Sequence, residues 1–313
     1  MKKVVLAYSG GLDTSFCVMY LTKELGYEVY TALANTGGFS EEELAAVEKR
    51  AYALGAKKHV NIDVTEDYYG KCIKYMVMGN VLRNKTYPIS VSSERTFQAL
   101  AIVNYANSIG ADAIAHGSTG AGNDQVRFEL TIKALAPEMK IIAPWRIWDI
   151  SSREEEIDYA NAHGIPVPVT KEDNYSMDRN IWHLSHEGMD LENPWKEPDF
   201  DKILKLMVPP EKAPDKPTYI EIEFEKGIPV KVDGKVMQPV EMLMYLNEVA
   251  GKNGVGIDDI VENRLVGMKS RGVYETPAGT VLYYAHKELE YLCLDRQTMH
   301  YKADVANKFA ELV

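Results

Sequence analysis

The first half of the chain is most constrained by a glycine-rich segment placed between an apolar run and a helical pattern. Residues 9–15 read Ser-Gly-Gly-Leu-Asp-Thr-Ser, directly after the apolar residues 4–7 and before the helical pattern of residues 16–25. A strand, a glycine turn and a helix in this order build an anion-binding loop, because glycine admits the anion and the helix N-terminus holds its charge. A Walker loop would contain a lysine, and this segment, the first glycine loop, has none. We therefore predict an anion held mainly by neutral donors, with an ordinary N-capped turn as the alternative.

Apolar runs continue to alternate with helical patterns as far as residue 164. Ser40 and Glu43 form a capping box at the start of one of these helices. Such alternation predicts a parallel sheet covered by helices on both faces. The predicted strands are residues 4–7, 29–34, 60–64, 113–115 and 141–143, and the predicted helices are residues 14–25, 40–54, 66–82, 93–108 and 152–163.

The character of the sequence changes after residues 165–168, Ile-Pro-Val-Pro, which we interpret as a crossover. Residues 169–217 are rich in loops and prolines. Beyond them, the patterns predict strands at 219–224 and 229–232 and helices at 240–249 and 282–292. With 313 residues the chain is long enough for two domains. We predict an α/β fold with a parallel-sheet nucleotide-binding domain at residues 1–168, followed by an α+β domain at residues 169–313.

Composition excludes several classes of protein. The net charge of −11 argues against general nucleic-acid binding, which needs a basic surface. No apolar run is long enough for a membrane span, and the residues before the first strand show no signal peptide. The three scattered cysteines predict no disulfide framework and fit a cytoplasmic location. His183 and His186 have the spacing of one helical turn, but no third ligand accompanies them, so no metal site is predicted.

A second glycine loop, residues 116–127, reads His-Gly-Ser-Thr-Gly-Ala-Gly-Asn-Asp-Gln-Val-Arg and also follows a predicted strand. Thr119 and Asn123 are suited to a carboxylate, Asp124 to an amine, and Arg127 to an anion held by two hydrogen bonds. Both glycine loops are expected at the carboxyl ends of parallel strands, where such sheets bind ligands. The alternative for the second loop is a structural turn.

These strings resemble a known family. The first glycine loop resembles the pyrophosphatase loop of the N-type ATP pyrophosphatases. Together with the second loop and four further segments, it makes the chain resemble the argininosuccinate synthase family from Lys2 to the last residue. The four segments are residues 142–146 (Ile-Ala-Pro-Trp-Arg), 163–170 (His-Gly-Ile-Pro-Val-Pro-Val-Thr), 175–178 (Tyr-Ser-Met-Asp) and 261–277, which contains Val-Glu-Asn-Arg and Gly-Met-Lys-Ser-Arg-Gly-Val-Tyr-Glu-Thr-Pro.

The resemblance implies an adenine nucleotide alpha hydrolase-like domain followed by a synthetase domain. It implies the condensation of citrulline with aspartate, driven by ATP cleavage to AMP and pyrophosphate with Mg²⁺ present. The citrulline ureido oxygen would attack the α-phosphorus, and the aspartate amine would then expel AMP, without a covalent enzyme intermediate. Catalysis would consist mainly of positioning and electrostatic stabilisation. A cytoplasmic homotetramer is also implied.

Carried over position by position, the resemblance assigns ATP, aspartate and citrulline to separate sets of residues. ATP would contact Ala7, Tyr8, Ser9, Gly10, Gly11, Leu12, Asp13, Thr14, Ser15, Ala34 and Gly117. Aspartate would contact Thr119, Asn123 and Asp124. Citrulline would contact Tyr87, Ser92, Asn123, Arg127, Ser176, Ser185, Glu262 and Tyr274. The predicted catalytic residues are Asp13, Asp124 and Arg127. Asp13 would orient the metal or the loop, with a helix-start carboxylate as the alternative.

The charged residues between Glu262 and Arg271 are interleaved with Gly267 and Gly272. A loop that lines a pocket is the preferred interpretation of this stretch. A solvated charged face is the alternative.

The sequence departs from the family pattern at three places. The family usually reads Gly-Thr-Ser-x-Ala-Arg-Pro where this chain reads Ser90-Val-Ser-Ser-Glu-Arg-Thr96, and the hydroxyl absent at Val91 would weaken the aspartate side of the pocket. Ala121 stands where a lysine is common. Family members also continue past the final Phe-Ala-Glu-Leu-Val with an arm used in tetramer assembly, which leaves the oligomeric state and the activity of this chain open.

Two other functions remain open at this stage. A tRNA-thiolating relative would share the first glycine loop, but it needs paired cysteines and a basic surface, and this chain offers neither. A non-catalytic homologue that binds nucleotide or amino acid, or serves as an assembly subunit, is the second alternative.

Overall fold

The structure is a computed structural model that describes residues 2–118, 122–148, 153–162, 164, 175–264 and 267–313. The chain forms two compact units, each built from non-consecutive segments. The first unit comprises Met1–Val64, Glu94–Asn174 and Arg264–Met268, and the second comprises Thr65–Ser93, Tyr175–Asn263 and Lys269–Val313. The predicted boundary at residue 168 lies outside the described residues and stays a prediction.

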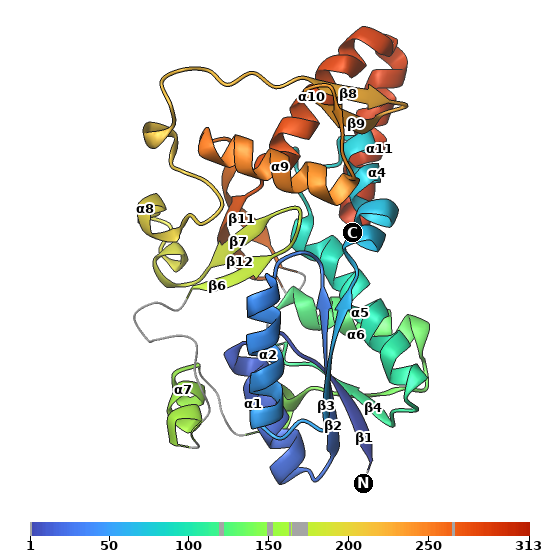
Figure 1. The fold of residues 1–313 in the computed structure, drawn as a ribbon, viewed down its shortest axis with the longest axis vertical. Helices are drawn as coiled ribbons and strands as arrows, with labels where there is room; N and C mark the ends of the chain where they lie inside the picture. The colour runs from blue at the N-terminus through green and yellow to red at the C-terminus, as the bar shows by residue number, and fades with distance from the viewer. Residues whose placement is uncertain (1, 119–121, 149–152, 163, 165–174, 265–266) are drawn as a thin grey trace. The chain divides into compact units, whose positions relative to one another are not determined.

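The first unit contains the predicted parallel sheet (Figure 1). Its strand order is β3-β2-β1-β4-β5. Val4 of β1 pairs with Val29 of β2 on one side and with Ala113 of β4 on the other, both in parallel. The chain therefore proceeds outward from β1 to β3 and then continues on the opposite side of β1. The strands are β1 (Lys3–Ala7), β2 (Glu28–Asn35), β3 (Lys58–Asp63), β4 (Ala113–Ala115) and β5 (Lys140–Ile142).

Helices pack on both faces of this sheet because successive strand residues point to opposite sides. Val4 and Leu6 share one core cluster with α1 and α2, whereas Val5 shares another with α5 and α6. The predicted capping box of Ser40 and Glu43 is present at the start of α2. The helices are α1 (Leu12–Met19), continued by a π-helical turn (Tyr20–Glu24), α2 (Glu41–Ala53), most of α5 (Ser90–Ser108), α6 (Asn123–Leu135), α7 (Arg153–Ala162) and a 3-10 turn (Pro144–Arg146).

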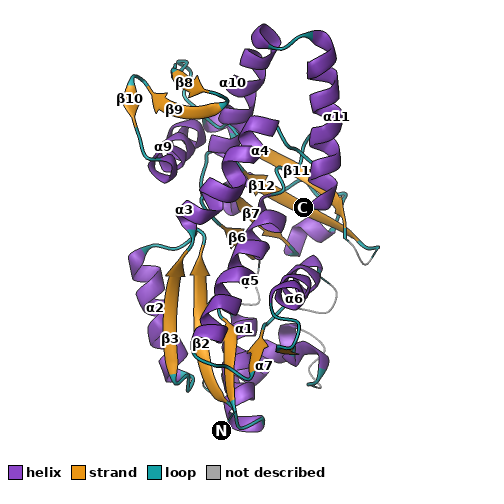
Figure 2. Ribbon diagram, turned by 90° about the vertical axis from the view of Figure 1, so that its right-hand side faces the viewer, coloured by secondary structure: helices purple, strands orange, loops and turns teal. Residues whose placement is uncertain are grey.

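The second unit contains two antiparallel sheets, as expected for an α+β domain (Figure 2). One sheet has the order β11-β12-β7-β6 and the other β10-β9-β8. The strands are β6 (Ser176–Arg179), β7 (Leu184–Glu187), β8 (Ile222–Glu225), β9 (Ile228–Val232), β10 (Lys235–Val236), β11 (Ile257–Asn263) and β12 (Lys269–Glu275). The helices are α3 (Thr65–Tyr68), a π-helical turn (Tyr69–Ile73), α4 (Lys74–Gly79), α8 (Phe200–Ile203), α9 (Pro239–Lys252), α10 (Pro277–Cys293) and α11 (Arg296–Leu312), with 3-10 turns at Met189–Glu192 and Pro210–Lys212.

The four-stranded sheet corrects two interpretations of the sequence. The charged residues between Glu262 and Arg271 lie mainly on the paired strands β11 and β12, so the prediction of a loop for this stretch was wrong. His183 and His186 lie before and within β7 rather than on a helix, and the Nε2 atom of His186 is 2.7 Å from the Oε1 atom of Glu275. Within the described residues, no group of three or more His, Cys, Asp and Glu side chains is arranged to hold a metal ion.

Among the described residues, no helix combines the length and the apolar content that a membrane-crossing segment requires.

Glu275, at the end of β12, is a fully buried carboxylate that forms hydrogen bonds with the backbone of residues 205–207. Its Oε2 atom accepts hydrogen bonds from the backbone N–H groups of Lys205 (3.1 Å), Leu206 (2.7 Å) and Met207 (3.0 Å). His186 contacts Oε1, so both oxygens of the Glu275 carboxylate have hydrogen-bond partners. A carboxylate can be buried without a large loss of stability only when it has such partners. The carboxylate therefore serves the folding of the second unit.

We expect Glu275→Gln to lower the free energy of unfolding by about 3 kcal/mol, because an amide presents one N–H₂ group to donors that require an acceptor. Urea-induced unfolding monitored by circular dichroism measures this change. Glu248→Gln is the matched control, since Glu248 pairs with Lys252 on the exposed surface and its replacement should change the free energy of unfolding much less. Equal effects for the two variants would contradict the role of Glu275.

Candidate active site

The first glycine loop joins β1 to α1 at the carboxyl end of the central strand. Gly10 has a φ of +77°, and a Cβ atom placed on it would lie 2.8 Å from Cγ2 of Val47 in α2. The guanidinium of Arg50, also in α2, donates a hydrogen bond to the carbonyl oxygen of Gly10. Gly11 precedes α1 as its extended N-cap residue. The loop is thus held against both β1 and α2, and glycine is required at its second position.

The three hydroxyls of this loop have different surroundings. The Oγ atom of Ser9 is 3.2 Å from Oγ1 of Thr14, and it accepts a hydrogen bond from the N–H group of Gly11 (3.4 Å). Ser15 is fully buried, and its hydroxyl lies 3.4 Å from that of Tyr8. Ser9 and Thr14 therefore line the mouth of the loop, whereas Ser15 packs beneath it. Ala34, another predicted ATP residue, is buried near the carboxyl end of β2.

The second glycine loop repeats the same arrangement next to the first. β4 ends at Ala115, and α6 begins at Asn123, so the chain again runs from strand through a glycine segment into a helix. A Cβ atom on Gly117 would lie 3.1 Å from Cγ2 of Thr14, so the two loops are in contact. Because β1 and β4 are neighbours at the point where strand order reverses, both helix N-termini lie where parallel sheets bind ligands. Thr119 and Ala121 lie outside the described residues.

The helix α6 was not predicted from the sequence, which indicated a loop continuing to Arg127. Asn123 and Asp124 occupy its first turn, and Arg127 follows one turn later. This placement changes how the three side chains are held, since a helix fixes their spacing and aims its N-terminal N–H groups at the loop.

His116 supports the second loop. It is buried, its Nδ1 atom accepts a hydrogen bond from the N–H group of Ser118 (3.3 Å), and its Nε2 atom is 3.2 Å from Glu129. Burial lowers the pKa of His116 despite the opposing effect of Glu129, so the ring is neutral at pH 7 with its proton on Nε2. Both ring nitrogens therefore contact protein groups, which favours a structural role.

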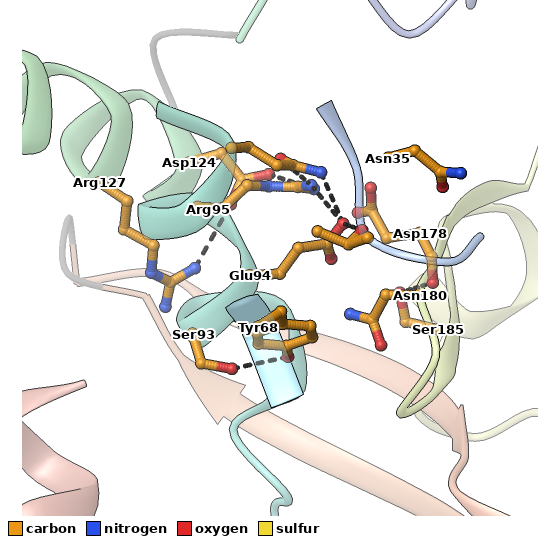
Figure 3. Close-up of polar contacts among 12 residues, drawn as sticks. Asn35, Tyr68, Ser93, Glu94, Arg95, Asp124, Arg127, Asp178, Asn180 and Ser185 are labelled. Carbon is orange, nitrogen blue, oxygen red and sulfur yellow. Dashed lines mark hydrogen bonds and ion pairs between the residues drawn. The ribbon is translucent and has the colours of Figure 1, made fainter. Parts of the chain in front are cut away.

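Asp124 lies between two arginines in the first unit (Figure 3). Its Oδ2 atom is 2.9 Å from Nη2 of Arg95, and its Oδ1 atom accepts a hydrogen bond from Nη1 of Arg127 at 3.3 Å. Burial opposes the ionisation of Asp124, but the charge of Arg95, followed by that of Arg127, holds its pKa below the ordinary value. Asp124 is therefore an ionised carboxylate at neutral pH, as an amine-binding role requires.

Sequence reasoning gave Arg95 no role, because it appeared only as part of the family pattern, and it did not single out Glu94. Both side chains are buried at the point where α5 enters the first unit. An adjacent acid and base inside an otherwise uncharged helical segment was the signal available.

The second unit holds six of the residues predicted for citrulline. Tyr87 and Tyr274 are buried with their ring centroids 5.1 Å apart, and the hydroxyl of Tyr274 donates a hydrogen bond to Glu262. Burial, together with the nearby carboxylate of Glu262, raises the pKa of Tyr274, so its hydroxyl stays protonated and serves as a donor. Ser185 of β7 pairs with Tyr274 of β12 across the sheet, which places both on adjacent strands.

The remaining predicted citrulline residues differ in exposure and location. Ser92 is buried, with its hydroxyl donated to the carbonyl of Ile89, whereas Ser176 is exposed at the start of β6. Asn123 and Arg127 belong to the first unit. The structure thus brings together Asn123, Asp124 and Arg127 in one unit, and Tyr87, Glu262 and Tyr274 in the other.

Arg83 is a second residue that sequence reasoning missed. Its guanidinium lies 5.6 Å from the centre of the Tyr87 ring and donates two hydrogen bonds of 3.1 Å to the carbonyl oxygen of Ala310. Arg83 and Tyr87 also form a backbone bridge. The position of Tyr87 is therefore tied to the last turn of α11.

Comparisons with known proteins agree with this architecture. Residues 3–166 match the family model described as "Arginosuccinate synthase N-terminal HUP domain", and residues 175–313 match "Arginosuccinate synthase C-terminal domain". Argininosuccinate synthase of Acetivibrio thermocellus is 60% identical over 312 residues, which are 100% of this chain and 76% of that protein. The corresponding enzymes of Alkaliphilus metalliredigens (57% identity, 75% of that protein) and Pelotomaculum thermopropionicum (56%, 77% of that protein) also match over 100% of this chain. Both halves of the chain thus match, and the chain belongs to the argininosuccinate synthase family.

Proposed function

We propose that the two glycine loops and the tyrosine pair carry out the reaction of this family. That reaction is the ATP-dependent condensation of citrulline with aspartate to argininosuccinate, with release of AMP and pyrophosphate in arginine biosynthesis. The observation that carries the proposal is the contact between Gly117 and Thr14, which joins the two glycine loops at the switch point of the parallel sheet. The residue assignments below are part of the proposal.

The first glycine loop would hold the pyrophosphate end of ATP. Gly10 and Gly117 leave space that a Cβ atom would fill, and the N-terminal turn of α1 supplies N–H groups without an intrahelical partner. Ser9 and Thr14 add hydroxyl donors at the mouth. Because this loop contains no lysine, it stabilises the charge on the departing pyrophosphate with neutral dipoles.

Asp124 and Asn123 would receive aspartate at the start of α6. The carboxylate of Asp124 is ionised and pairs with the ammonium group of aspartate, which must lose a proton before it attacks carbon. Arg127 would hold the carboxylate of citrulline. Hydroxyl and carboxylate groups would hold the rest of the substrate, and they belong to Tyr87, Ser92, Ser176, Ser185, Glu262 and Tyr274. Holding the reactants in place is the main contribution asked of these residues.

The reaction proceeds in two steps in this proposal. The citrulline ureido oxygen attacks the α-phosphorus of ATP, and the bond to pyrophosphate breaks. The aspartate amine then attacks the activated carbon, and the bond to the ureido oxygen breaks as AMP leaves. Mg²⁺ would neutralise phosphate charge and be held largely by the nucleotide, since protein Mg²⁺ sites commonly use one or two carboxylates with substrate phosphates. Asp13, at the start of α1, is the carboxylate beside the loop.

Cytoplasmic location and homo-oligomeric assembly are part of the same proposal. Both rest on membership of the family rather than on a contact in this chain. Mass measurement of the purified protein in solution tests the assembly.

The test of the proposed function is to incubate the purified chain with ATP, Mg²⁺, citrulline and aspartate and to measure pyrophosphate. We expect sustained release over many turnovers to require both amino acids, together with equimolar AMP and argininosuccinate, whereas citrulline without aspartate supports at most one pyrophosphate per active site. Omission of each amino acid in turn is the control. Tight ATP binding without pyrophosphate release would contradict catalysis and favour the non-catalytic homologue instead.

A further inference from the structure

Arg95 lies between two carboxylates in the first unit and is almost fully buried (Figure 3). Its Nη2 atom is 2.9 Å from Asp124, its Nη1 atom is 3.8 Å from Glu94, and its side chain is 10% exposed. Nη1 also donates a hydrogen bond of 3.1 Å to the Oε1 atom of Gln98, one turn further along α5. Both terminal nitrogens of the guanidinium therefore have protein acceptors.

The acid beside Arg95 is fixed by neighbours of its own. Thr36, which follows β2, donates a hydrogen bond of 2.7 Å to the Oε1 atom of Glu94, and Gln98 donates one of 2.6 Å to the same atom. Gln98 thus donates to Glu94 and accepts from Arg95, so its amide locks both side chains in one orientation. A planar guanidinium held at one edge in this way presents its other edge at a fixed angle.

Arg127 contacts the same carboxylate in a different manner. It lies on the same helix as Asp124, its hydrogen bond is longer at 3.3 Å, and the proposed function assigns it to the carboxylate of citrulline. An arginine that turns toward a ligand leaves Asp124 with the contact from Arg95 alone. The buried arginine is therefore the one suited to hold Asp124 in both the free and the ligand-bound protein.

We propose that Arg95 is a positioning residue for aspartate, which fixes the carboxylate of Asp124 for the substrate ammonium group without contacting the substrate. This inference rests on the proposed function of Asp124 and extends it to a residue outside the assigned site. The cluster formed by Glu94, Gln98 and Arg95 orients the carboxylate of Asp124 before any ligand binds. Preorganised groups of this kind lower the cost of binding.

The experiment compares Arg95→Met and Arg95→Lys with the unchanged chain by steady-state kinetics. We expect Arg95→Met to raise KM for aspartate about 30-fold while KM for ATP changes less than about 3-fold, because the carboxylate of Asp124, which Arg95 holds in place, serves aspartate and not ATP. Arg95→Lys keeps the charge but cannot span Gln98 and Asp124, so its KM for aspartate should rise about 10-fold. Lys49→Met, an exposed lysine on α2, is the control for loss of one positive charge.

The pH profile separates positioning from a general loss of structure. Within the described part of the chain, the charged groups that contact Asp124 are Arg95 from α5 and Arg127 from α6, and both lower its pKa. Removing Arg95 raises that pKa, so the acid limb of kcat/KM for aspartate should move to higher pH in Arg95→Met and less in Arg95→Lys. A general folding defect would lower activity at all pH values without moving this limb.

Two results would overturn the inference. One is an equal rise of KM for all three substrates in Arg95→Lys. This variant keeps the charge, and we expect it to fold even if methionine is not tolerated at this position. The other is an unmoved acid limb. Asp124→Asn distinguishes failure of the proposed function from failure of the inference about Arg95. If it leaves KM for aspartate unchanged, the proposed aspartate site at Asp124 is wrong. If it raises that KM while both Arg95 variants leave it unchanged, only the present inference fails.

Discussion

Replacing Gly10 with alanine is expected to lower kcat/KM for ATP by about 100-fold or more. Two physical causes act together. Gly10 has a φ of +77°, which costs an L-residue roughly 1 kcal/mol, and the added Cβ atom would lie 2.8 Å from Cγ2 of Val47. Val47 is buried and β-branched, so it cannot rotate away freely. The loop that receives pyrophosphate must therefore shift.

Gly26→Ala is the matched control for this prediction. Gly26 has a φ of +66°, and no atom lies within 4 Å of a Cβ placed on it, so it shares the backbone strain without the clash. We expect near-normal kcat/KM for ATP in Gly26→Ala, with a smaller loss of thermal stability than in Gly10→Ala. Val47→Ala added to Gly10→Ala should recover part of the activity, because it removes the atom that the methyl group meets. Equal activity of the two glycine variants would refute the steric account of the loop.

Replacing Asp124 with asparagine is the second change with a large expected effect. An amide leaves the ammonium group of aspartate without a charged partner and leaves Arg95 and Arg127 without theirs. We expect KM for aspartate to rise about 100-fold, close to 2.7 kcal/mol of binding free energy, whereas KM for ATP should stay within about 3-fold. Initial rates of pyrophosphate release at varied aspartate and varied ATP measure the two constants.

Glu138→Gln provides the control for Asp124→Asn, since it removes one carboxylate from an exposed position beyond the end of α6. Its kinetic constants should match those of the unchanged chain. A comparable rise of the ATP and aspartate constants in Asp124→Asn would show that Asp124 does not serve aspartate specifically.

The parallel sheet of the first unit could be predicted from the sequence because most of its strands contain short apolar runs, and most of these runs are followed by a helical pattern. Val4 and Val5 are both fully buried, on opposite faces, as such runs require. The four-stranded antiparallel sheet of the second unit was missed for the opposite reason, whereas the strands predicted at residues 219–224 and 229–232 overlap β8 and β9 of the other sheet. β6 reads Ser-Met-Asp-Arg and β7 reads Leu-Ser-His-Glu, so neither carries a clear apolar alternation.

The helix α6 escaped prediction because few of its side chains are buried. Phe128 and Ile132 pack into the core, but Leu130 is 70% exposed, and charged residues fill much of the remaining surface. The contact between Arg95 and Asp124 joins two helices, and no local pattern signals a pairing of that kind. Local chemistry therefore identified the two glycine loops, whereas the residues that support them required the three-dimensional structure.

In the proposed reaction, the first glycine loop receives pyrophosphate while the citrulline oxygen takes its place on the α-phosphorus. Citrulline labelled with ¹⁸O at the ureido oxygen tests this directly when the products are analysed by mass spectrometry. We expect the label in AMP and unlabelled pyrophosphate. Unlabelled AMP, or label in pyrophosphate or inorganic phosphate, would contradict it.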